Sequence, residues 1–218
     1  MRYRTKQEFV YRTLRDAIMK CELPPRQRLI IEDLARELHV SAIPVREALK
    51  LLQSEGLVTN VPHTGSMVSA IARDSITEVF GLMEGLEFVA TRKAAERMTS
   101  EEAAGLEVTV REMDDALRDG RHEEWADLNS KFHLGISRLS GMPLLHEMME
   151  RVMAHWDRLR RCYFEGVLAN RMEQAQEEHR ALLRVMKTMD LPELERMVKQ
   201  HNQGALVAYA EYLRGRPD

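Results

Sequence analysis

Apolar residues recur at helical spacing along the first fifty-five residues and predict three short helices. The first lies within residues 6–20 and ends before Pro24 and Pro25, and the second lies within residues 32–40. Ser41 can cap the third helix, with Pro44 in its first turn. The apolar stripe of this third helix turns inward and leaves a polar face outside, made of Arg46, Glu47, Lys50 and Gln53.

After Gly56, which ends the third helix, the pattern changes to two runs typical of strands. These runs, LVTNV and SMVSA, flank the turn PHTG and predict a two-stranded wing. Two short helices joined by a tight turn, with a cationic outer face on the second, suit insertion into the major groove of DNA. Residues 1–70 are therefore predicted to form a winged helix-turn-helix, and the wing tip with His63 and Gly65 can approach DNA.

The remainder of the chain has the helical period throughout. Residues 71–75 are interpreted as a linker, and Ser75 can cap a helix that runs to about Met98. Five further helical segments follow, at 100–120, 122–140, 143–165, 171–189 and 191–214, and none alternates with period two. The predicted fold is mainly α, with an antiparallel six-helix bundle over 76–218. The first bundle helix is expected to bury Ile76, Val79, Phe80, Met83, Leu86, Val89 and Ala90.

Charge is distributed unevenly between the two halves. Residues 1–73 contain 12 Lys and Arg against 8 Asp and Glu, whereas the rest contains 20 against 27. A basic N-terminal half suits a polyanion such as DNA, although an ordinary solvated surface explains this surplus about as well. The chain has no apolar run long enough for a membrane helix and no secretory signal, so we expect a cytoplasmic protein without a membrane partner.

The run LIIEDLARELHVSAIPVREALKLLQSEGLV resembles the winged helix of the GntR family of bacterial regulators, whose pattern is LxxxLAxxLxVSxxPVREALxxLxxEGLV. This resemblance implies sequence-specific DNA binding. The implied DNA contacts are Arg28, Ser41, Arg46, Lys50, His63 and Gly65. Ala42 stands where this family usually has Arg, so one expected contact is missing. The alternative for Arg46 is an ion pair within the domain, with Glu47 or Glu55.

Three histidines fall on apolar helix faces in the second half. Asn129 and His133 are four residues apart, so they share the inward face of one helix. His179 and His201 lie in the apolar stripes of two other helices. A lone inward histidine is usually a hydrogen-bonded core residue, whereas three neutral imidazoles and an oxygen suit a divalent transition metal such as Zn²⁺, with positions left open for a ligand.

The motifs NSKFH, EEH and QH, in that order, resemble the FCD-type sensor domain of GntR regulators, in its six-helix VanR-like branch. The resemblance implies that Asn129, His133, His179 and His201 bind zinc, with nickel or manganese as alternatives, and that a small carboxylate or similar metabolite completes the coordination. Asn129 stands where many relatives have a carboxylate, which lowers the expected metal affinity.

The effector site carries a second departure from the family. Relatives often have an effector-binding Arg at the position of Met83, so a less charged effector is one option. A carboxylate clamped by Arg138, Arg158 or Arg160 is the other.

We therefore expect a homodimeric transcription regulator, a repressor rather than an enzyme, that binds a palindromic operator and is controlled by a small metabolite beside a metal. One alternative is a regulator that senses the metal itself, and another is a domain whose histidines bind nothing and that only dimerises. A metal-dependent hydrolase is disfavoured because no general base accompanies the histidines.

Overall fold

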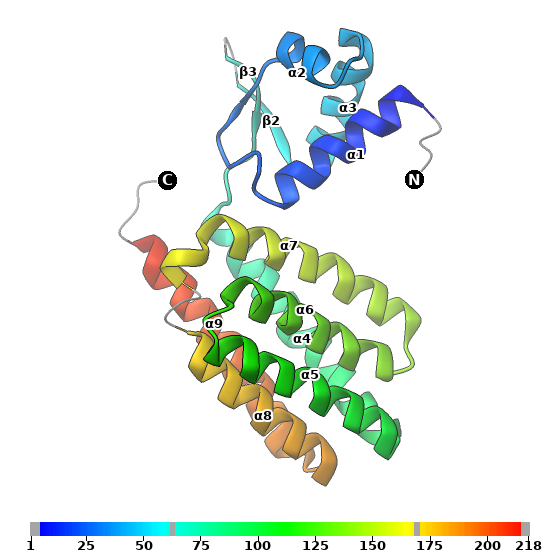
Figure 1. Ribbon diagram of the computed structural model, residues 1–218, viewed down its shortest axis with the longest axis vertical. Helices are drawn as coiled ribbons and strands as arrows, with labels where there is room; N and C mark the ends of the chain where they lie inside the picture. Colours follow the sequence, from blue (N-terminus) through cyan, green and yellow to red (C-terminus); the bar gives the residue numbers. More distant parts are fainter. Residues whose placement is uncertain (1–4, 62–63, 168–170, 215–218) are drawn as a thin grey trace. The chain divides into compact units, whose positions relative to one another are not determined.

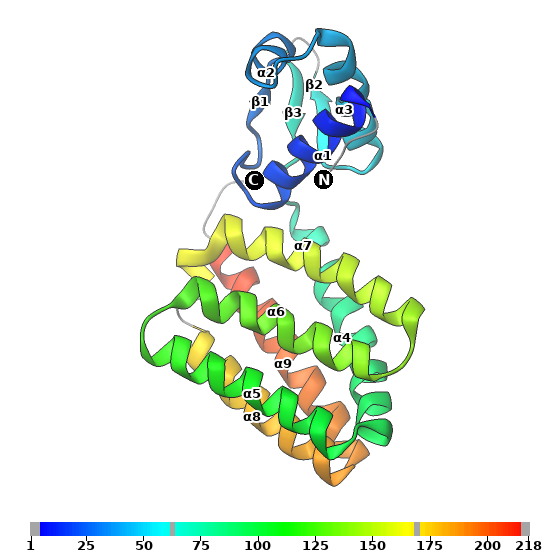
Figure 2. The ribbon, with the colours of Figure 1, turned by 45° about the vertical axis from the view of Figure 1, so that its right-hand side comes forward.

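The structure is a computed structural model that describes residues 5–61, 64–167 and 171–214. Within these ranges the chain forms nine α-helices and three short strands, in two compact units, Met1–Ile71 and Ala72–Asp218 (Figures 1 and 2). The predicted mainly helical fold, with a small sheet confined to the N-terminal part, is confirmed. No helix in the described ranges is both long and apolar enough to cross a membrane.

The N-terminal unit packs three helices against a three-stranded antiparallel sheet. The helices are α1 (Lys6–Met19), α2 (Ile31–Glu37) and α3 (Ala42–Ser54), and the strands are β1 (Arg28–Leu29), β2 (Val58–Val61) and β3 (Gly65–Val68). Strand β3 is central and pairs with both others, and the pairing of β2 with β3 forms the predicted wing. Strand β1 was not predicted, because two residues are too short to show an alternating pattern.

One apolar core holds the N-terminal unit together. The inward residues of α3 contribute to it as the sequence predicts, since Val45, Ala48 and Leu52 are fully buried and Leu49 is nearly so. They pack with residues of α1, α2 and the strands in a single cluster. This packing fixes which face of α3 remains in solvent, and that face carries the polar residues.

The C-terminal unit is a bundle of six helices, as predicted. They are α4 (Arg73–Arg97), α5 (Ser100–Arg118), α6 (His122–Leu139), α7 (Pro143–Val167), α8 (Met172–Thr188) and α9 (Leu191–Arg214). Helices α4 and α9 pack against each other, and so do α5 and α8 (Figures 1 and 2). A capping box of Thr99 and Glu102 begins α5, and non-helical backbone at Tyr163 kinks α7.

Helix α4 differs from the prediction in two ways. It begins at Arg73, after Ala72, so Ser75 lies inside the helix and does not cap it. Val89, expected inward, is 38% exposed, whereas Glu87 is only 4% exposed. The helical period explains the second difference, because Glu87 lies four residues after Met83 and three before Ala90, on the buried stripe.

Candidate DNA-reading and metal-binding sites

The outer face of α3 presents two cations to solvent. Arg46 and Lys50 are exposed and lie one helical turn apart. The ion pairs considered for Arg46 are absent, because Glu47 pairs with Lys50 at 2.8 Å and Glu55 contacts Tyr11 and Arg15. No hydrogen bond or ion pair joins Arg46 to any described residue. Arg46 is therefore free to bind a ligand outside the protein.

The other predicted DNA contacts lie on the surface of the same unit. Ser41 is exposed at the N-cap of α3, and its side chain makes no capping hydrogen bond, contrary to the expected role as a cap. Arg28 is exposed in β1. Gly65 begins β3 with φ of +90°, a conformation that favours glycine. His63 lies outside the described residues.

One exposed residue of α3 was missed at the sequence level. Ile43 is 72% exposed, and it lies three residues before Arg46 and seven before Lys50, on the same helix face. An apolar residue next to the buried stripe gave no reason to expect exposure. Its exposure could have been found from the helical period, because Val45 lies on the buried stripe of α3 and Ile43 does not.

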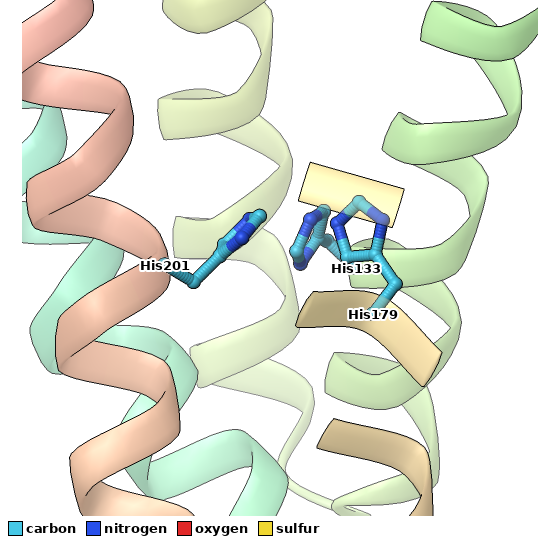
Figure 3. A group of neighbouring side chains, drawn as sticks. All are labelled: His133, His179 and His201. Carbon is cyan, nitrogen blue, oxygen red and sulfur yellow. The ribbon is translucent and has the colours of Figure 1, made fainter. Parts of the chain in front are cut away.

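The structure brings the three predicted histidines together. His133 of α6, His179 of α8 and His201 of α9 converge, and their ligand nitrogens all lie within 4.8 Å of one another (Figure 3). Each is buried, with exposures of 2%, 0% and 9%. Burial, helped by the charges of His201 and His133, lowers the pKa of His179 well below its usual range, so this imidazole is neutral, as a metal ligand must be.

Two buried carboxylates contact the Nδ1 atoms of two of the imidazoles. Glu87 contacts Nδ1 of His133, and Glu178 lies 2.8 Å from Nδ1 of His201. Each ring then keeps Nε2 for a metal, which is the usual way in which outer carboxylates orient histidine ligands. Burial opposes ionisation of Glu87, but the charge of His133 and hydrogen bonds from His133 and Asn202 lower its pKa to about 2.

This cluster fits a divalent transition metal. Nε2 of His133 and both ring nitrogens of His179 are buried without a hydrogen-bond partner among the described residues. Such groups are costly to bury unless something binds them. Asn129, 4% exposed on α6, lines the cavity beside His133 and His201, where its amide oxygen can add a hard ligand.

The cavity beside the histidines is small, about 30 Å³. That volume holds roughly one or two water molecules. Its wall combines apolar side chains with a guanidinium, that of Arg171, which is only 6% exposed. Of the three predicted effector contacts, Met83 lines the cavity, whereas exposed Arg138 and buried Arg158 are not among the lining residues.

Sequence reasoning missed three buried charged residues of this site. Glu87 could have been found as a carboxylate on an apolar stripe, and Glu178 as the residue beside His179 in the EEH motif. Arg171 gave no periodic signal, because it occupies the N-cap of α8 rather than a helix face.

Comparison with known proteins identifies both domains. The model of the gntR family of bacterial regulatory proteins matches residues 6–68, and that of the FCD domain matches residues 78–204. The chain belongs to the GntR family. Its second domain is an FCD domain, as the motifs predicted. Members are DNA-binding transcription regulators, so this GntR protein is a regulator and not an enzyme, also as predicted.

Several named regulators resemble this GntR protein over most of its length. The HTH-type transcriptional regulator McbR of Escherichia coli K12 is 27% identical over 88% of this chain and 87% of its own. A regulator from an unstable DNA locus of Streptomyces ambofaciens is 30% identical over 91% of this chain and 82% of its own. The solved structure of E. coli McbR/YncC superposes with a TM-score of 0.73 at 25% identity, covering 96% of this chain and all of that one.

Proposed function

We propose that this GntR protein is a repressor whose affinity for a palindromic operator is controlled by a small metabolite bound beside a divalent metal in the FCD domain. The convergence of three buried imidazoles, with unpaired nitrogens and an oxygen donor nearby, carries the proposal. His133, His179, His201 and Asn129 would hold zinc, with nickel or manganese as alternatives. The bound metal would supply a Lewis-acidic centre for an oxygen of the metabolite.

Control of DNA binding requires two conformations with different affinities for the metabolite. A metabolite that prefers the weakly binding conformation by about 100-fold shifts the equilibrium by ~2.7 kcal/mol. In the N-terminal unit, Arg28, Ser41, Arg46, Lys50, His63 and Gly65 are the proposed DNA contacts. A regulator that binds the bacterial chromosome works in the cytoplasm, which is the compartment we infer.

A regulator that senses the metal itself is the second candidate. The small cavity favours it, because about 30 Å³ leaves no room for a metabolite in this conformation. The test is to select a duplex from a random-sequence DNA pool and measure affinity for it after chelation, after zinc is restored, and with small molecules from the host cell. Metal sensing predicts that zinc alone changes the affinity, whereas our proposal requires a small molecule in addition. Failure to select any duplex would refute both.

We expect a homodimer that uses the outer face of α4. Gly81, Leu82, Gly85 and Val89 share this face, and Leu82 is 47% exposed. Nothing lies within 4 Å of a Cβ built on either glycine, so a second helix could approach closely. Leu82→Arg should give a monomer in analytical ultracentrifugation, because it places a charge in an apolar contact.

The matched control for the α4 face is Leu144→Arg on α7, where the leucine is 70% exposed and should tolerate the charge. If the Leu82→Arg variant sediments as a dimer, like the wild type, this face is not part of the dimer interface.

A further inference from the structure

A chain of side-chain hydrogen bonds links the end of α3 to both strands of the wing. The hydroxyl group of Ser66, on β3, donates to Oδ1 of Asn60, on β2, at 2.9 Å. Nδ2 of Asn60 in turn donates at 3.1 Å to Oε1 of Gln53, in the last turn of α3. Asn60 and Ser66 are opposite each other in the β2–β3 pairing, next to the pair of Val61 and Gly65 at the end of the strands. These hydrogen bonds therefore tie the wing to the end of the helix.

This chain of hydrogen bonds contributes little to the stability of the fold. Gln53 and Asn60 are exposed, and none of the three residues belongs to the apolar core of the N-terminal unit. Water competes for exposed amide and hydroxyl groups, so the net gain from pairing them is small. What the hydrogen bonds do determine is the direction in which the amide group of Gln53 points.

The group of Gln53 that remains free is a donor. Because Oε1 accepts from Asn60, the side chain presents Nε2 to solvent, and no hydrogen bond joins Nε2 to a described residue. An amide nitrogen donates through its N–H groups and accepts nothing. A phosphate oxygen only accepts, whereas the base edges in the major groove offer both donors and acceptors. The free amide nitrogen therefore suits the backbone of DNA.

The position of Gln53 along α3 agrees with a contact to the backbone. Gln53 follows Arg46 by seven residues and Lys50 by three, so the three side chains share one face of the helix. Seven residues correspond to about 10.5 Å along the helix axis. The N-terminal residues of a reading helix contact the base edges, so its last turn lies closer to the backbone. Glutamine is also among the side chains that bind phosphate oxygens in complexes with DNA.

We propose that Gln53 donates a hydrogen bond to a backbone phosphate in each half-site, and that Asn60 and Ser66 are positioning residues that orient its amide group. The proposal rests on α3 being the reading helix. It adds a contact that carries no sequence information but fixes the register of the protein on DNA. Because the same hydrogen bonds tie β2 and β3 to α3, the helix and the wing engage DNA as one unit.

The first test substitutes Gln53→Met, which keeps the length of the side chain and removes its donor. The affinity of the full chain for the duplex selected from the random pool should fall about 10-fold, the value of a hydrogen bond to a charged group. Each phosphate of the duplex is then replaced in turn by methylphosphonate, which removes its charge. At one phosphate in each half-site, the wild type should lose affinity and Gln53→Met should lose almost none. Gln7→Met, the same substitution on α1, is the control and should bind like the wild type.

The variant Gln53→Glu distinguishes a phosphate from a base. A carboxylate still accepts from Asn60 but repels a phosphate, so Gln53→Glu should bind more weakly than Gln53→Met. A base that donates, such as cytosine through N4, would instead accept the carboxylate. Gln53→Glu with the affinity of the wild type or better would therefore overturn the phosphate contact.

The positioning role is tested by combining substitutions. Asn60→Leu should weaken DNA binding in the wild type and should have almost no further effect in the Gln53→Met variant, because both changes remove the same contact. Ser66→Ala should behave in the same way with a smaller effect. Losses of affinity that multiply in the double variant would exclude Asn60 as the residue that orients Gln53, and thermal denaturation checks that each variant is folded.

The outcomes separate this proposal from the assignment of the reading helix. A selected duplex that is sensitive to Arg46→Ala but bound equally well by Gln53→Met would overturn the phosphate contact alone. A chain that selects no duplex would overturn the reading helix together with it.

Discussion

Arg46→Ala is expected to abolish sequence-specific DNA binding while leaving the N-terminal unit folded. Arg46 is exposed and makes no hydrogen bond or ion pair with a described residue, so its removal takes no contact from the fold. A bidentate arginine contact with a base contributes about 1–3 kcal/mol of discrimination, and a dimer makes it twice. The affinity for the selected duplex should therefore fall roughly 30-fold to 10⁴-fold. Fluorescence anisotropy measures the affinity, and thermal denaturation checks the fold.

Arg12→Ala is the matched control for charge. Arg12 is an exposed arginine of α1 that pairs with Glu8 at 2.9 Å, and its loss should change DNA affinity little at physiological salt. If Arg46 contacts only phosphate, all sequences should weaken equally, whereas a base contact relaxes sequence preference at one position. Unchanged affinity of Arg46→Ala for the selected duplex would remove Arg46 from the contact surface.

Loss of metal from the FCD domain is the second large effect that we expect. Purified wild-type protein should carry nearly one metal ion per chain, and His133→Ala, His179→Ala and His201→Ala should each carry almost none. The reason is that three imidazoles are the minimum set for a tight site, and the amide of Asn129 is a weak substitute for any of them. Elemental analysis by mass spectrometry gives the metal and its stoichiometry.

His146→Ala is the control for the histidine variants. His146 lies in the same domain and contacts Ser137 at 2.7 Å, but it is not part of the converging cluster. Circular dichroism of every variant separates loss of metal from loss of fold, which matters most for fully buried His179. Wild-type protein that remains free of metal even after reconstitution with zinc, nickel or manganese would assign the three histidines to the core.

The helices were more predictable from the sequence than the residues that surround the histidine cluster. Helix α3 was predictable because its apolar stripe, its proline and its terminal glycine all indicate the same helix. The convergence of the histidines was predictable because each lies on an inward face. Arg171 was not, because its burial depends on a close approach to Gly204, thirty-three residues later, which no local pattern encodes. For the same reason the sequence suggested Arg138 as a clamp for the effector, although this side chain is exposed.

The size of the cavity has a kinetic consequence. A space of about 30 Å³ admits water but no metabolite, so binding must wait for the packing of Phe80, Trp156 and their neighbours to open. The observed rate of association would then be limited by the rate of opening, so it would stop increasing at high concentrations of the metabolite. A sensor of this kind responds to sustained changes in concentration and filters out fluctuations that are shorter than the opening time.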